Sequence, residues 1–262
     1  MTPAFVFPPP PPEQVALGRR DTPVPTGVSR RPNATQGGGQ AVRVLEILLA
    51  DARLPGGGHT QSAGLEAALR AGMPIDSVPD YLRTRLATVA AVEAGTAVVA
   101  RAVCAVTPPR PADLTAVEQA WRARVLSPAL RSASLQLGRG YARLVARLWP
   151  GVGADALTQA LPVGRPVAVG VAAHLAGLDA AATSRLVAYD DVQTVCAAAL
   201  KLHPMDPAAA TVWAVQVADE IEALAQRLAT LTTPEDIPAL GAVHIEAWAE
   251  LHAVSPRRLF RA

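Results

Sequence analysis

Apolar residues recur at helical spacing along most of the chain after residue 41. The longest such run covers residues 78–106, where leucine and valine repeat at spacings of three, four and seven positions, the signature of an α-helix. No segment alternates apolar and polar residues between hairpin turns, so no β-sheet is expected. The same reasoning predicts further helices over residues 41–50, 60–72, 113–121, 128–149, 153–160, 166–177, 180–202, 207–231 and 235–253.

Polar residues mark where these helices should begin. The order Ser-Pro favours a cap followed by the first helical residue, and Asp or Thr can cap with a side-chain oxygen. The expected fold is therefore all-α, a single compact bundle of about nine or ten helices over residues 41–262. The expected cap residues are Thr60, Asp76 or Ser77, Asp113, Ser127 before Pro128, and Asp179.

Residues 1–40 have a different composition. They contain the run Pro8–Pro12 and the glycines Gly37–Gly39, which favour extended and flexible chain over a packed core. We expect a disordered tail, and a role as a polyproline ligand stays open. The N-terminus has neither a basic stretch nor an apolar stretch of the kind that makes a signal peptide, so a cytoplasmic protein is expected.

Composition narrows the range of partners. Half of the residues are hydrophobic but only 4% are aromatic, so Ala, Leu and Val must build the core. The formal net charge is +2, and no dense basic block appears, so nucleic acid is not an expected partner. Lys201 is the only lysine. Cys104 and Cys196 lie in apolar helical segments, which predicts buried, reduced thiols.

Few motifs point to chemistry. The glycines Gly56–Gly58 precede a predicted helix, but His59 and Thr60 follow where a phosphate-binding loop needs Lys and Ser or Thr, so a tight turn is expected. The five histidines show no local metal-ligand spacing, although the fold could still assemble a site. No nucleophile elbow occurs. We expect no catalytic residue and no metal ligand.

Two charge patterns are expected to face solvent. Asp190-Asp191 and Asp219-Glu220 are adjacent acids, and neighbouring helix positions point apart, so solvated faces explain them better than an acid–base pair. Arg139, Arg143 and Arg147 are four residues apart and form one basic ridge, which faces solvent or an acidic partner.

The segment 45–70, LEILLADARLPGGGHTQSAGLEAALR, resembles the opening motif of the UreF family of urease accessory proteins. In that motif an apolar helix leads into Leu-Pro-x-Gly, an aromatic residue and Ser-x-Gly-Leu-Glu. His59 stands where the family usually has Phe, and Gln61 where an aromatic residue or His is common. The matching residues are Leu54, Pro55, Gly57, Ser62, Gly64, Leu65 and Glu66.

Further blocks resemble the same family in the same order, so that the resemblance covers about residues 41–262. Arg165 replaces a frequent His, and Met205-Asp206-Pro207 replaces the usual Leu-Gly-Gln after Pro204. Ala253 and Ala262 are departures in the C-terminal block. The matching residues in these blocks are Arg131, Ser134, Gln136, Gly138, Gly170, Lys201, Pro204, His252, Arg258, Leu259, Phe260 and Arg261.

The resemblance implies an all-α adaptor that tends to dimerise and is not an enzyme. The family sits between a UreD/UreH-type protein and the GTPase UreG and helps to deliver nickel to apo-urease. The chain itself is then expected to bind no cofactor, because nickel and GTP belong to its partners. The candidate partner-binding residues are Glu66, Arg131, Lys201, Arg258, Leu259, Phe260 and Arg261; the other matching residues are expected to be structural.

Alternatives stay open beside this interpretation. The C-terminal residues can pack on their own domain, and Glu66, Arg131 and Lys201 can serve internal ion pairs or helix ends. A helical-bundle enzyme would need a deep pocket with two or more buried titratable side chains. The replaced residues at His59 and after Pro204 also leave room for a divergent paralogue that serves another metalloenzyme.

Overall fold

The computed structural model describes residues 38–51, 53–54, 60–106 and 109–260. The expected disordered tail lies almost wholly outside this range, as do the glycine turn at 56–58 and the motif residues Pro55, Gly57, His59 and Arg261. Within the described residues the structure contains helices and no β-strand, which confirms the all-α fold class.

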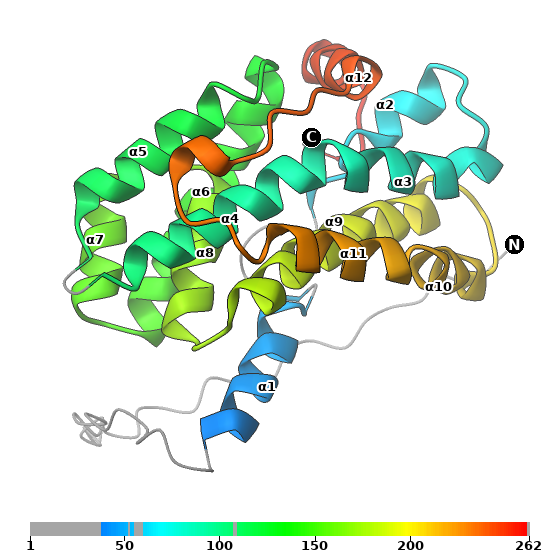
Figure 1. Cartoon of the computed structure of the whole chain (residues 1–262). Helices are drawn as coiled ribbons and strands as arrows, with labels where there is room; N and C mark the ends of the chain where they lie inside the picture. Colours follow the sequence, from blue (N-terminus) through cyan, green and yellow to red (C-terminus); the bar gives the residue numbers. More distant parts are fainter. Residues whose placement is uncertain (1–37, 52, 55–59, 107–108, 261–262) are drawn as a thin grey trace, which may run out of the picture.

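The helices follow one another with short connections (Figure 1). Two 3-10 turns, η2 (Ile75–Ser77) and η3 (Pro234–Asp236), precede α3 and α12. The α-helices are α1 (Gly38–Leu49), α2 (Leu65–Arg70), α3 (Val78–Ala87), α4 (Val89–Cys104), α5 (Pro111–Arg122), α6 (Pro128–Leu148), α7 (Val152–Ala160), α8 (Arg165–Leu175), α9 (Ala180–Leu202), α10 (Pro207–Gln216), α11 (Ala218–Leu228) and α12 (Val243–Val254).

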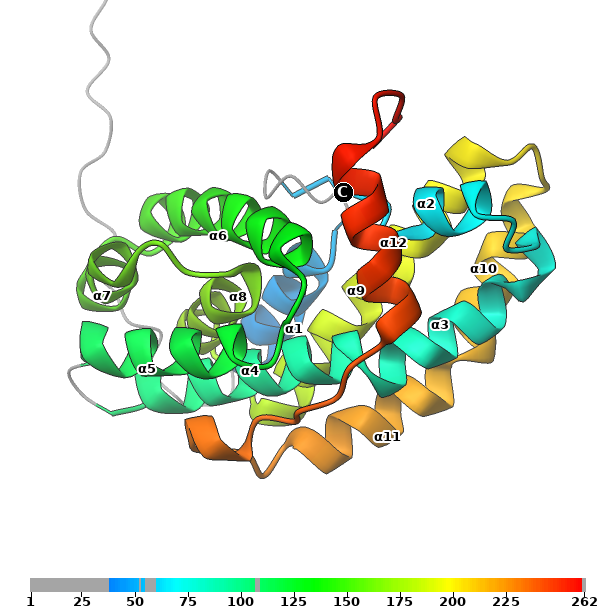
Figure 2. The same ribbon diagram turned by 90° about the horizontal axis from the view of Figure 1, so that it is seen from above.

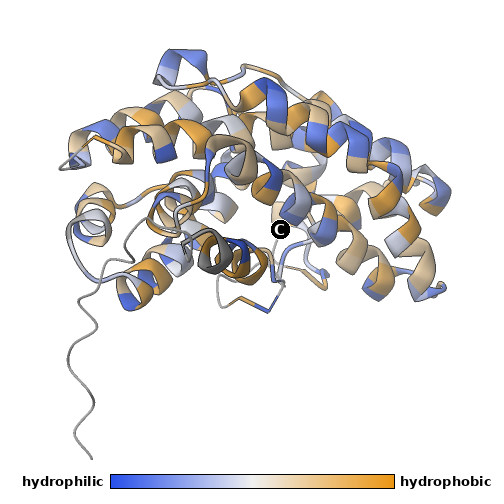
Figure 3. Ribbon diagram, turned by 60° about the horizontal axis from the view of Figure 1, so that its bottom comes forward, coloured by the Kyte–Doolittle hydropathy of each residue, from blue (hydrophilic) through white to orange (hydrophobic). Residues whose placement is uncertain are grey.

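Helices α4 and α9 run through the middle of the bundle (Figure 2). Helices α5, α6, α7 and α8 gather at one end of α4, whereas α2, α3, α10 and α12 lie toward the other (Figure 2). Along the helices, apolar and polar residues alternate in the way expected of elements with one buried face (Figure 3).

Small residues let the central helices approach closely. At the crossing of α4 and α8, a Cβ added to Gly170 would overlap the backbone carbonyl of Ala97. A Cβ added to Gly138 of α6 would overlap the carbonyl of Val163, in the connection before α8, so two glycines of the family blocks allow close packing. A core poor in aromatic residues is therefore filled by bringing backbones together rather than by large side chains.

Two long predicted helices are each split in two. The predicted helix over 78–106 breaks at Thr88, whose hydroxyl donates to the carbonyl of Thr84 at 2.6 Å, a bond that competes with regular helix geometry. The predicted helix over 207–231 breaks at Val217, which turns into the core between α10 and α11.

Several predicted helix starts are also wrong. α2 begins after Gly64, in left-handed conformation, rather than at Thr60. α5 begins at Pro111, so Asp113 lies inside its first turn and pairs with Arg110 instead of capping. α12 begins at Val243 rather than 235, because Pro238 and Gly241 interrupt the intervening chain.

Other caps are confirmed. Ser127 accepts a hydrogen bond from the backbone amide of Leu130 at 3.1 Å, and Asp179 accepts one from Ala182 at 2.7 Å. Asp206, in the block that departs from the family, caps α10 by accepting from Ala208 at 2.9 Å. That departure therefore has a structural role: it supplies the cap and first-turn proline of α10.

The thiols and the most apolar segment are buried, as their composition predicts. Cys104 and Cys196 are both free and buried, and burial raises their pKa values to about 12 and about 11. The segment Ile75–Cys104 is long and apolar enough to cross a membrane by length and composition alone. Most of it is covered by neighbouring helices, as in the core helix of a globular bundle.

Replacing Gly170 by Ala tests the close crossing of α4 and α8. The added methyl group meets the Ala97 backbone, so we expect the free energy of unfolding to fall by about 1–3 kcal/mol. Urea unfolding measures the change. Gly241→Ala is the matched control, because its nearest neighbour would be a side-chain oxygen at 3.6 Å; equal effects at both positions would contradict the packing account.

Candidate partner-docking site

The C-terminal segment folds back from α12 onto α2, and one carboxylate receives it. We call residues 255–260 the tail. Glu66, in the first turn of α2, is buried, and its two oxygens accept hydrogen bonds from the backbone amides of Leu259 at 2.7 Å and Phe260 at 2.9 Å. Glu66, in the Ser-x-Gly-Leu-Glu block, thus binds the C-terminal block. Glu66 and Leu259 are 193 residues apart in the sequence.

Arg70 completes this arrangement one turn further along α2. Its guanidinium lies 2.7 Å from Oε1 of Glu66 and donates to the hydroxyl of Ser255 at 3.1 Å and to the carbonyl of Arg257. A buried carboxylate needs such donors, because a charge without hydrogen bonds is costly to remove from water. We call Glu66 with Arg70 the clasp.

His252 of α12 lies against the clasp from inside. Its Nε2 is 3.4 Å from Oε2 of Glu66, without hydrogen-bond geometry. Burial lowers the pKa of His252, although the neighbouring Glu66 carboxylate acts in the opposite direction. A neutral imidazole here leaves the charge of Glu66 to Arg70 and the two tail amides.

The clasp decides which tail side chains face inward. Phe260 is 5% exposed, and its ring lies 5.3 Å from Nζ of Lys201, within the range of a cation–π contact. Leu259 points the other way and is 63% exposed. Arg258 is also exposed and donates at 3.4 Å to the carbonyls of His252 and Ala253, at the end of α12.

Three apolar side chains of α12 are also exposed. Along α12, Val243, Leu251 and Val254 follow helical spacing, and each is at least 60% exposed. We call these three residues with Leu259 the outer strip.

The remaining candidate residues divide between two places. Glu66 and Lys201 both contact Phe260, so the structure brings them together at the tail. Arg131 lies apart and donates to the carbonyls of Val125 and Leu126 at 2.5 and 2.9 Å, where it holds the turn before α6. Internal contacts therefore account for part of what each of these three residues does.

The other motif residues are mostly structural. Leu65 and Ser62 are buried, and the hydroxyl of Ser134 accepts a hydrogen bond from the amide of Arg165 at 3.0 Å. Gln136 and Pro204 are exposed, while Leu54 is partly buried.

Asp190 and Asp191 do not form a solvated face, and that expectation is wrong. Asp191 is buried and pairs with Arg85 through two hydrogen bonds of 2.5 and 2.8 Å. Asp190 pairs with Arg165, which also holds Glu93 at 2.7 Å. Burial raises the pKa of Glu93 and of Asp190, and the Arg165 charge opposes that shift. The residues of this cluster outside α9 come from three other helices, so the local spacing of the sequence could not predict these pairs.

The prediction that Arg139, Arg143 and Arg147 face solvent is confirmed, because all three are exposed.

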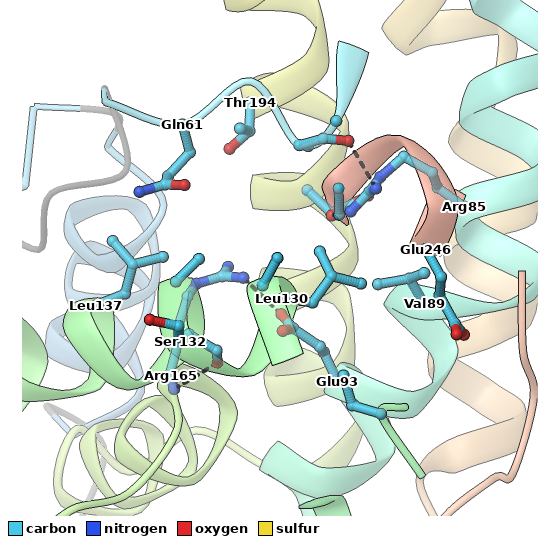
Figure 4. Close-up of a pocket in the computed structure, with 18 of the residues that line it drawn as sticks. Gln61, Arg85, Val89, Glu93, Leu130, Ser132, Leu137, Arg165, Thr194 and Glu246 are labelled. Atoms are coloured by element: carbon cyan, nitrogen blue, oxygen red, sulfur yellow. Dashed lines mark hydrogen bonds and ion pairs between the residues drawn. The ribbon is translucent and has the colours of Figure 1, made fainter. Parts of the chain in front are cut away.

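These ion pairs line a cavity of about 330 Å³ between α4, α6, α8, α9 and α12 (Figure 4). A deep pocket with buried titratable groups is the feature that a helical-bundle enzyme would need. Here each of the acids Glu93, Asp190 and Asp191 pairs with an arginine, so the polar groups of this wall are bound to one another. Among the described residues, no group of three or more His, Cys, Asp or Glu side chains could hold a metal ion.

Sequence reasoning missed Arg70 and Arg165 as functional partners. Arg70 stands four residues after Glu66, the spacing of an ion pair on one helix face, so this signal was present. Arg165 differs from the His that is frequent in the family, and the sequence around it does not indicate its ion pairs with Glu93 and Asp190.

Replacing Glu66 by Gln tests the clasp. The amide nitrogen of Gln would face a backbone N–H, and the charge would be lost, so we expect unfolding to become easier by about 1–3 kcal/mol. Amide hydrogen exchange at Leu259 and Phe260 should also accelerate. Glu222→Gln is the control, because it removes a largely exposed ion pair with Arg185. Unchanged exchange in the tail would rule out the clasp.

Comparison with known proteins agrees with this architecture. A family model, UreF, matches residues 75–218. The urease accessory protein UreF of Mycobacterium sp. (strain JLS) is 34% identical over 219 residues, which cover 82% of this chain and 96% of that protein. The protein of the same name from Mycolicibacterium vanbaalenii is 35% identical over 213 residues, covering 79% and 96%. That of Mycobacterium tuberculosis (strain H37Rv) is 34% identical over 200 residues, covering 72% and 88%. The chain therefore belongs to the UreF family and is a urease accessory protein rather than the enzyme that it serves.

Proposed function

We propose that this chain is an adaptor in urease maturation that bridges a UreD/UreH-type protein and the GTPase UreG during insertion of nickel into apo-urease. The observation that supports it best is the tail, which the clasp holds with the Leu259 side chain exposed. Nickel is cargo in this scheme, and nickel and GTP bind to the partners rather than to this chain.

The outer strip is the surface that we assign to the UreD/UreH-type protein. It is apolar, exposed and set on a helix whose opposite face is packed, so docking would not need the domain to open. The backbone amides of Leu259 and Phe260 are both hydrogen-bonded to Glu66, which holds this part of the tail in place. Binding then costs less conformational entropy than it would with a mobile tail.

The side of the tail near Lys201 is the surface that we assign to UreG. Lys201 lies in the last turn of α9, and its ammonium group lies over the ring of Phe260. Binding of a partner at this contact would therefore depend on whether the tail is in place. Homodimerisation within the complex also belongs to the proposal, as the family resemblance suggests. A paralogue that serves another metalloenzyme is the alternative, and reconstitution decides between them: this protein with its partners, nickel, GTP and bicarbonate should activate apo-urease.

Leu259→Asp tests the assignment of the outer strip. The side chain is exposed, so the free energy of unfolding should change by less than about 0.5 kcal/mol, while co-purification with the UreD/UreH-type protein should fall at least tenfold. Deleting residues 255–262 should abolish co-purification, but it also removes two donors from Glu66, so the point variant is the cleaner test. Undiminished co-purification of Leu259→Asp would refute the assignment.

Lys201→Glu tests the second surface. Reversing this charge removes the cation–π contact, worth about 0.5–1 kcal/mol at an exposed position, so Tm should fall only slightly. Binding of UreG should weaken much more. Lys201→Arg keeps a cation over the Phe260 ring and is the control. A large drop in Tm with normal UreG binding would assign Lys201 a purely internal role.

A further inference from the structure

Three arginines form a basic row on the exposed face of α6. Arg139, Arg143 and Arg147 are all exposed and follow one another at intervals of four residues, so they lie along one face of the helix. Four residues of α-helix rise by about 6 Å, which sets the spacing of the row. We call these three residues the ridge. Helix α6 packs on α7, α8 and α12, and the ridge lies on the face that these helices leave open (Figure 2).

Helix α6 itself has no acid that could pair with the ridge. Its 21 residues include four arginines and neither Asp nor Glu. The fourth arginine, Arg131, is bound to backbone carbonyls before the helix. Like charges four residues apart destabilise a helix, and the helix dipole favours a cation only in the last turn, where Arg147 lies. The folding of α6 therefore accounts for one member of the ridge at most.

The helices packed against α6 do not supply acids to the ridge either. Helix α8 contains neither Asp nor Glu, and Asp155 of α7 makes no ion pair within the described part of the chain. Glu250 of α12 accepts a hydrogen bond from the amide of Ala129 at 2.9 Å, about 15 Å along the helix axis from Arg139. The described residues thus leave the three guanidinium groups of the ridge without a carboxylate.

Exposed arginines elsewhere usually have an acid close by. Arg53, Arg83 and Arg110 each lie within 3.0 Å of an aspartate two or three residues away in the sequence. Arg43 and Arg227 have no ion pair with a described residue, but each is the only arginine on its helix. The ridge differs from both cases, because three cations without carboxylates share one helix face.

The shape of the ridge selects among negatively charged partners. Proteins bind single-stranded nucleic acid in basic grooves with aromatic rings, but the ridge lies on a convex helix face, and Tyr141 and Trp149, the nearest aromatic residues in sequence, pack into the core. An anionic membrane surface is held by apolar side chains beside the charges, and Leu148 is the only large apolar side chain exposed on α6, a fully described helix. An acidic helix fits better, because carboxylates at every fourth position repeat at the same spacing of about 6 Å and pair with the fixed fork of a guanidinium.

We propose that the ridge docks an acidic helix of a partner protein, in which carboxylates recur at every fourth residue and pair with Arg139, Arg143 and Arg147. Exposed ion pairs are individually weak and are screened by salt. The ridge therefore orients the partner and speeds its association more than it holds the complex together. The tail and the outer strip take no part in this surface, so either proposal can fail alone.

Titration of the full-length protein with two stapled, alanine-based helical peptides at low salt tests the proposal. The first peptide has Glu at every fourth position, and the second has the same number of glutamates at every fifth position, which spreads them around the helix. The arginine Nε–Hε signals in NMR spectra report binding. We expect the first peptide to bind at least about fivefold more tightly, and this preference should disappear in about 0.5 M salt. Equal affinities or no binding would overturn the proposal, as would tighter binding of an oligothymidylate or of phosphatidylglycerol vesicles.

Matched variants place the peptide on the ridge. Arg139→Gln combined with Arg143→Gln should abolish the preference for the first peptide. Arg43→Gln combined with Arg227→Gln removes the same charge from other helices and should leave that preference unchanged. All four side chains are exposed, so Tm should change little in either variant, and the comparison of the two peptides on the unmodified protein does not depend on any substitution. A ridge variant that keeps its preference, or an equal loss in both variants, would contradict the assigned surface.

Discussion

A buried carboxylate that must be hydrogen-bonded organises the surface of this protein. Glu66 lies in the first turn of a six-residue helix, and two of its donors come from the other end of the chain. Since an unpaired buried charge would be very costly, the fold is complete only when the tail is in place. The same two hydrogen bonds turn Phe260 inward and Leu259 outward, so one interaction both closes the domain and shapes its candidate docking surface.

The interior follows a different rule. Small residues bring α4, α6 and α8 close together, and several buried charged side chains are gathered into arginine–carboxylate pairs at the junction with α9. Removing one partner of such a pair leaves the other charge buried and unpaired, which is strongly destabilising. The pairs therefore tie distant helices to one another. Tight apolar contacts and the arginine–carboxylate pairs therefore both hold the bundle together, and the cavity lies beside those pairs.

Sequence alone predicted the helices well, because periodicity is local, and it predicted the caps at Ser127 and Asp179 for the same reason. It failed where the deciding contact is distant: Asp191 lies 106 residues from Arg85, and no spacing rule connects them. The family blocks identified Glu66 and the C-terminal residues as important. That one block binds the other, and that Phe260 faces inward, depends on tertiary packing that no single block contains.

The solitary lysine has a practical consequence. Lys201 carries the sole side-chain amine of all 262 residues, and it stands over the ring of Phe260. An amine-directed fluorophore applied to the native protein would label one side chain, next to the segment whose position matters most for assembly. With the α-amine of the chain blocked, the emission of that dye would report attachment and release of the C-terminus in real time.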